Sequence, residues 1–217
     1  MRPAVLLAAL LALALAAPRA EPAVTCHCFQ SRSFDPAAPA SADPYILANA
    51  RSSLLSASCG VSKATLVRAV MGGTTPEDLW IAYWTAPRVG RDAESLLGAA
   101  RETGSWKAAL AGARGLPPAF GTALGRGAPP SELAALAVDD VAAARLGADR
   151  AALRTLRDHG ASSEQVVLSL LLAPRLRITP PEVLTRHTVG GLAWGALLRE
   201  AALEPTGIEA AMRAALR

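Results

Sequence analysis

Two segments of the chain share one pattern, in which a capping residue is followed by an apolar run and then by a proline. They are residues 75–88 and residues 162–175, and a shift of 87 positions aligns them. Thr75 and Ser162 suit helix N-caps, because their hydroxyl groups accept hydrogen bonds from amides of the first turn. Since the following residues are apolar on nearly every face, we expect two buried helices, each ending at its proline.

The 87-residue offset extends beyond these helices without a gap from Ala48 to Arg88. It aligns Gly60 with Gly147, and with one inserted residue it continues to align Trp106 with Trp194. No segment alternates between apolar and polar residues for long enough to form a strand. We therefore expect an all-α fold of two tandem duplicated multi-helix units, packed about a pseudo-twofold axis and preceded by an extended arm.

Composition and capping residues divide the chain into five segments. Turn-forming prolines exclude a helix in the arm, and a second cluster of glycine and proline predicts a linker. Capping boxes at Thr179–Glu182 and Thr206–Glu209 predict the starts of two later helices. The segments are a signal peptide (1–20), the extended arm with its cysteines and prolines (21–42), helical unit 1 (43–115), the linker (116–130) and helical unit 2 (131–217).

Residues 1–20 have the pattern of a secretory signal peptide: Arg2 precedes an apolar run, Val5 to Ala17, and small residues follow. The alternative is a retained membrane anchor, although the run is shorter than the roughly 20 residues that a spanning helix needs. We expect a periplasmic or secreted protein with no membrane contact after cleavage. Because residues 1–20 contain two of the 22 basic side chains and none of the 18 acidic ones, the remainder is nearly neutral. We therefore expect no nucleic-acid partner.

The arm contains the densest group of ligand-type side chains, Cys26, His27 and Cys28. In an oxidising compartment, a disulfide from Cys28 or Cys26 to Cys59 would fasten the arm to the first helix, and we favour Cys28. Two alternatives remain open. Cys59 is a buried free thiol, or the two arm cysteines and His27 bind a soft metal ion such as Cu or Zn. Absence of a cofactor is the main expectation.

Four further residues are candidates for a pocket or an anion site. Trp80 and Trp84 align with Val167 and Leu171, so they are core residues or line an aromatic pocket between the units. Arg88 and Arg175 follow the aligned prolines. They complement the helix dipoles at these ends or, as a symmetric pair, clamp an anion.

Three motifs at the N-terminal side of the first unit carry a resemblance to other proteins. They are Cys26-His27-Cys28-Phe29, Arg32-Ser33-Phe34-Asp35-Pro36 and Ala42-Asp43-Pro44-Tyr45. In these motifs the chain resembles a group of small exported proteobacterial proteins of no assigned activity. The resemblance implies export and a bacterial origin, and it supplies no catalytic residue.

The sequence favours a binding or scaffolding function over catalysis. It contains no Gly-x-Ser-x-Gly, phosphate loop or His-Glu-x-x-His motif. We expect an exported, all-helical binding or scaffolding module with an unknown protein or small-ligand partner in the periplasm. The alternative is a metal- or thiol-handling protein that uses Cys26, His27 and Cys28. An enzyme of unknown class is the third possibility.

Overall fold

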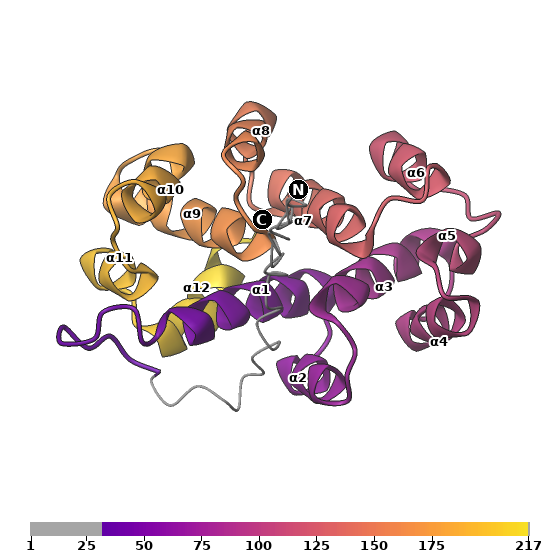
Figure 1. Cartoon of the computed structure of the whole chain (residues 1–217), viewed down its shortest axis with the longest axis horizontal. Helices are drawn as coiled ribbons and strands as arrows, with labels where there is room; N and C mark the ends of the chain where they lie inside the picture. Colours follow the sequence, from indigo (N-terminus) through magenta and orange to yellow (C-terminus); the bar gives the residue numbers. More distant parts are fainter. Residues whose placement is uncertain (1–31, 217) are drawn as a thin grey trace, which may run out of the picture.

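The computed structural model describes residues 32–216, which form an assembly of helices (Figure 1). No strand is found in this range, so the predicted all-α class is confirmed. The elements are α1 (Asp43–Cys59), α2 (Lys63–Met71), α3 (Pro76–Val89), α4 (Ala93–Thr103), α5 (Trp106–Ala109), α6 (Pro118–Gly125), α7 (Pro130–Arg145), α8 (Arg150–Asp158), α9 (Ser163–Leu176), α10 (Pro180–Thr188), α11 (Trp194–Glu200), the 3-10 turn η1 (Pro205–Gly207) and α12 (Ile208–Ala215).

Several helix bounds follow the sequence offset. The helices α2 and α3 begin and end 87 residues before α8 and α9, and α1 begins 87 residues before α7. Local capping explains the matching starts of α2, α3, α8 and α9. The side chains of Ser62 and Thr75 accept hydrogen bonds from amides at the starts of α2 and α3, and Asp149 and Ser162 do the same for α8 and α9.

The longest-range packing joins the two halves of the chain. The first helix, α1, packs against α9 and α12, while α7 packs against α3 and α6. In Figure 1, α9 to α12 therefore gather beside α1 at one end, and α4 to α7 gather beside α3 at the other. Near the middle, Arg51 of α1 forms ion pairs with Glu164 at the start of α9 and with Glu77 at the start of α3. The first turns of α3 and α9 are therefore both bound to the same side chain, Arg51.

The helices α3 and α9, which contain the two aligned apolar runs, are the central helices. They are buried, as their sequences predict. Leu79 and Ile81 of α3 lie in the core, as do Val167, Leu168 and Leu171 of α9. A helix that is apolar on nearly every face needs neighbours on all sides, and α1, α7 and α10 supply much of that cover.

The predicted helix ends at the two prolines were wrong. The helix α3 continues past Pro87 to Val89, and α9 continues past Pro174 to Leu176. Each proline removes one backbone hydrogen bond, but both rings are exposed, so the break lies on the solvent side of the helix. Gly90 and Arg177, both in the left-handed conformation, cap the two helices instead.

Two segments near the ends of the predicted units differ from expectation. Residues 116–130, predicted as a linker, contain helix α6, because Pro118 suits a first helical turn and Phe120 is buried. The capping box predicted at Thr206–Glu209 was wrong: residues 205–207 form a 3-10 turn and α12 begins without a side-chain cap. The capping box at Thr179–Glu182 is confirmed.

The described part of the arm, residues 32–42, is a series of turns. It is fastened to α11. Asp43 accepts hydrogen bonds from the amides of Trp194 and Gly195, at 3.0 and 2.9 Å. Phe34 packs beside Gly195, and the guanidinium of Arg199 lies 5.4 Å from the centre of the Phe34 ring. The arm and the second half of the chain are therefore in direct contact.

The Asp43 contact predicts a pH dependence. Burial raises the pKa of the Asp43 carboxyl above its ordinary value, against the opposing effect of the two amides. A carboxyl with a raised pKa binds its proton more tightly in the folded chain, so its contribution to the free energy of unfolding becomes more favourable as the pH falls through that pKa. We expect Asp43→Asn to remove this contribution. Chemical denaturation of the parent chain and the variant between pH 3 and pH 7, at steps of roughly one pH unit, would measure the difference in the free energy of unfolding. A pH profile identical in the two proteins would contradict this prediction.

Candidate functional site

The two tryptophans selected from the sequence are core residues. The side chains of Trp80 and Trp84 are almost completely buried on α3. The indole N–H of Trp84 donates a hydrogen bond to Asp140 Oδ2 on α7 at 3.2 Å, and its ring lies 4.8 Å from that of Phe120. The indole nitrogen of Trp80 has no hydrogen-bond partner within the described part of the chain. Both side chains therefore pack α3 into the core.

The two arginines selected from the sequence have different surroundings. Arg88 Nη2 lies 3.0 Å from Asp140 Oδ2, and its guanidinium stacks 4.0 Å from the centre of the Trp84 ring. Arg88 Nη1 also donates to the Trp84 carbonyl at 2.6 Å. Arg175 is exposed near the end of α9, and α3 and α9 extend to opposite sides of the molecule (Figure 1). The structure does not bring the two guanidinium groups together.

Cys59, at the end of α1, lines a cavity of about 500 Å³ together with Tyr83, Trp84 and Arg88. Its sulfur lies 3.6 Å from Ser58 Oγ, and burial raises the pKa of the thiol above its ordinary value. Because the thiolate is the reactive form, this shift disfavours nucleophilic chemistry at Cys59. No group of three metal-binding side chains occurs within residues 32–216.

Cys26, His27 and Cys28 lie outside the described residues, so the Cys28–Cys59 disulfide and the soft-metal site stay predictions. Mass analysis of unreduced peptides from the purified protein should show one link between Cys59 and Cys28. The finding of three free thiols with a bound metal ion would contradict the disulfide and favour the metal site.

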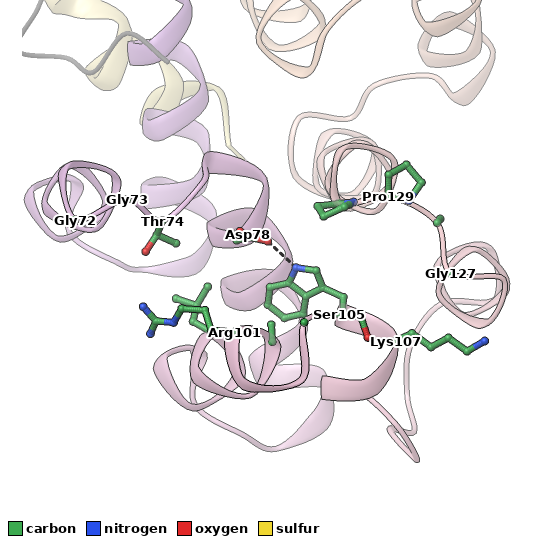
Figure 2. A pocket seen from close by; sticks show the side chains of 15 residues that line it. Gly72, Gly73, Thr74, Asp78, Arg101, Ser105, Lys107, Gly127 and Pro129 are labelled. Atoms are coloured by element: carbon green, nitrogen blue, oxygen red, sulfur yellow. Dashed lines mark hydrogen bonds between the residues drawn. The ribbon is translucent and has the colours of Figure 1, made fainter. Parts of the chain in front are cut away.

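A cleft of about 560 Å³ opens where three turns of the first half meet (Figure 2). The turn between α2 and α3, the turn between α4 and α5, and the turn between α6 and α7 form its walls. Leu97 and Ala100 of α4 supply apolar surface. The other lining residues are Gly72, Gly73, Thr74, Asp78, Arg101, Gly104, Ser105, Trp106, Lys107, Gly127, Ala128, Pro129 and Pro130.

Trp106 is held in place by Asp78 inside this cleft. Its indole N–H donates to Asp78 Oδ1 at 2.7 Å, as the dashed line in Figure 2 shows. The other carboxylate oxygen accepts from the hydroxyl of Thr75 at 2.6 Å. Because Thr75 also accepts from the Asp78 amide at the start of α3, the same residues cap that helix and orient the indole. The ring position is thus tied to the helix framework.

Two basic side chains border the cleft, Arg101 on α4 and Lys107 on α5. Both are exposed, and neither lies within 4.0 Å of an acidic group in residues 32–216. In Figure 2, Arg101 and Lys107 lie on opposite sides of Ser105, and Lys107 extends beside the turn that carries Gly127. The cleft therefore combines apolar surface, the edge of an indole that is otherwise buried, the Asp78 carboxylate that holds this indole, and two exposed cations.

The lining of the cleft has little local sequence signal, and the sequence analysis did not select it. Its residues belong to three separate turns, and the alignment of Trp106 with Trp194 is the feature that points toward them. Comparisons with protein-family models, curated proteins and solved structures give no match. No helix within residues 32–216 combines the length and the hydrophobicity required to span a bilayer.

Proposed function

We propose that this chain is an exported, all-helical binding module made of two duplicated units, and that its ligand lies in the cleft beside Trp106. The apolar run in residues 1–20 and the small residues after it support export to the periplasm. The open cleft, with its apolar wall and two exposed cations, is the observation on which the binding function rests.

Reciprocal packing supports the duplication. If α1 to α6 correspond to α7 to α12, the contact of α1 with α9 is equivalent to the contact of α7 with α3. The contact of α1 with α12 is likewise equivalent to that of α7 with α6. Two pairs of contacts that exchange partners in this way are what a pseudo-twofold axis produces. The first helix of each unit then packs mainly on the other unit.

The dimensions and chemistry of the cleft suit a small ligand or a short segment of a partner. Ligand sites in proteins have volumes of roughly 300 to 1,000 Å³ and combine apolar surface with a few polar groups. Leu97 and Ala100 provide the apolar surface, and Arg101 and Lys107 provide positive charge at the rim. An anionic ligand with an apolar part fits this arrangement best.

Ligand screening with a cleft-filling variant tests the proposal. Residues 21–217 would be screened by thermal denaturation and tryptophan fluorescence against small carboxylates, phosphates and short peptides. Ala100 is half-buried in the cleft wall, so Ala100→Phe should remove the response to any ligand bound there. Ala108→Phe is the matched control, because Ala108 is exposed and does not line the cleft. A response that persists in Ala100→Phe would place the ligand elsewhere and contradict the proposal.

A further inference from the structure

A narrow apolar groove lies between α1, α2 and α3 in the first half of the chain. Leu55, Leu66 and Leu79 are its buried lining residues. Val67 and Val70, both half-buried, line it from α2, and the other lining residues are Ala48, Arg51, Ser52, Pro76 and Trp80. The open volume of about 40 Å³ is too small for a ligand of drug size but suits part of one apolar side chain.

The equivalent groove in the second half is covered by the side chain of Arg157 on α8. Its Nη2 donates to Asp139 Oδ1 at 2.7 Å and to the Ala135 carbonyl at 3.4 Å, both on α7. The 87-residue offset aligns Arg157, Asp139 and Ala135 with three residues that line the groove of the first half, Val70, Ser52 and Ala48. Because valine cannot form the bridge to α1 that arginine forms to α7, the groove of the first half stays open and apolar.

The helix beside the open groove has little cover of its own. Leu66 is the one buried residue of α2, and this helix packs mainly on α1. Its counterpart α8 buries both Leu153 and Leu156, and it packs on α10 as well as on α9. An apolar side chain in the groove would therefore give α2 the cover that α8 obtains from Arg157 and from α10.

The described part of the arm begins close to this groove. The guanidinium of Arg32, the first described residue, lies 5.7 Å from the centre of the Tyr45 ring on α1. Tyr45 shares one face of α1 with Ala48 and Ser52, which line the groove, because residues three and seven positions apart lie on the same side of a helix. In Figure 1 the start of the described arm lies below α1, as α2 does. The chain before Arg32 therefore starts beside the face of α1 that carries the groove.

Phe29, which lies outside the described residues, is within reach of the groove. It precedes Arg32 by three residues, and extended chain spans roughly 3.3 to 3.6 Å per residue, or about 10 Å in all. Ala48 and Ser52 follow Tyr45 by three and seven residues, which is about 5 to 10 Å along the helix at roughly 1.5 Å per residue. The two spans match.

From this geometry we infer that residues 21–31 pack on the first half of the same chain, with the Phe29 ring in the groove between α1 and α2. The arm then fastens both halves, because Phe34 packs beside Gly195 of α11. The groove shares no lining residue with the ligand cleft, so the packing of Phe29 is independent of the proposed binding function.

Hydrogen exchange of residues 21–217, with the thiols reduced so that no disulfide holds the arm, tests this packing. We expect Phe29→Ala to speed amide exchange in α2 about 10-fold or more, because α2 loses the side chain that covers it. Exchange in α8 should not change, since Arg157 covers the equivalent groove there. Gln30→Ala is the matched control in the arm and should leave α2 unchanged. Equal acceleration in α2 and α8, or none in either, would overturn the inference.

A pair of substitutions transfers the cover of the second half to the first. Ser52→Asp combined with Val70→Arg should form the bridge that Asp139 and Arg157 form, so that α2 is protected without the arm. In this background Phe29→Ala should leave exchange in α2 unchanged. Acceleration that persists there would place Phe29 outside the groove and contradict the inference.

Photo-cross-linking locates the ring directly. A photoreactive benzoylphenylalanine in place of Phe29 should cross-link to α1 or α2 of the same chain, which mass analysis of the peptides would show. Cross-links to other helices, or between two chains, would show that the groove does not take the chain's own arm, and the inference would be wrong.

Discussion

Residues 43–115 expressed alone should not fold, although the sequence predicts them as one helical unit. Within this fragment, α1 would lose α9 and α12, and α3 would lose α7. The apolar surface that these contacts bury, including the Trp84 ring that packs on Phe120, would be exposed to water at a cost of roughly 25 cal/mol per Å². Helices of 9 to 17 residues are marginal in water without such packing. Circular dichroism should show little helix and no cooperative thermal transition.

Complementation of two fragments is the control for this experiment. Residues 32–127 and residues 128–217, mixed in equal amounts, contain all the helices of the described range and should recover the helical spectrum and a cooperative transition as a complex. Cooperative unfolding of residues 43–115 alone would contradict the packing of α1 and α3 on the second half. It would mean that each unit folds on its own helices.

The starts of α2, α3, α9 and α10 were predictable because the signals that set them are local. Ser62, Thr75, Ser162 and Thr179 each accept a hydrogen bond from an amide three residues later, and the sequence alone places these pairs together. Burial of the central helices was predictable for a similar reason, since a run without a polar face has to be covered.

The partners of the helices were not predictable from the same pattern. An apolar face shows that a helix is covered, but it does not specify which helix covers it, so the packing of α3 on α7 has no signature in either segment. Rules that rest on the local sequence also failed where the surroundings lowered the free-energy cost of an unfavourable residue. Pro87 and Pro174 lie inside helices because their rings are on the solvent side, which no nearby residue indicates. The cleft, formed by three separate turns, was missed because its residues are distant in sequence.

Trp84 connects α3 with α6 and α7, and we expect Trp84→Ala to lower the free energy of unfolding strongly. The side chain is 1% exposed, packs on Phe120 of α6 and donates to Asp140 of α7. Truncation removes the ring and leaves a cavity that helices on three sides fill only in part. Substitutions of this kind cost about 3 to 5 kcal/mol. The change also removes the surface on which the Arg88 guanidinium stacks.

Urea denaturation of Trp84→Ala, Trp84→Phe and the parent chain separates packing from hydrogen bonding. The phenylalanine variant keeps most of the apolar contact but loses the indole N–H, while Asp140 retains its ion pair with Arg88. Its free energy of unfolding should therefore fall by only about 1 to 2 kcal/mol. Equal losses in the two variants would show that the Asp140 hydrogen bond, and not the packing of the ring, stabilises this site. A loss below about 1 kcal/mol in Trp84→Ala would show that α3, α6 and α7 are not held together by this side chain.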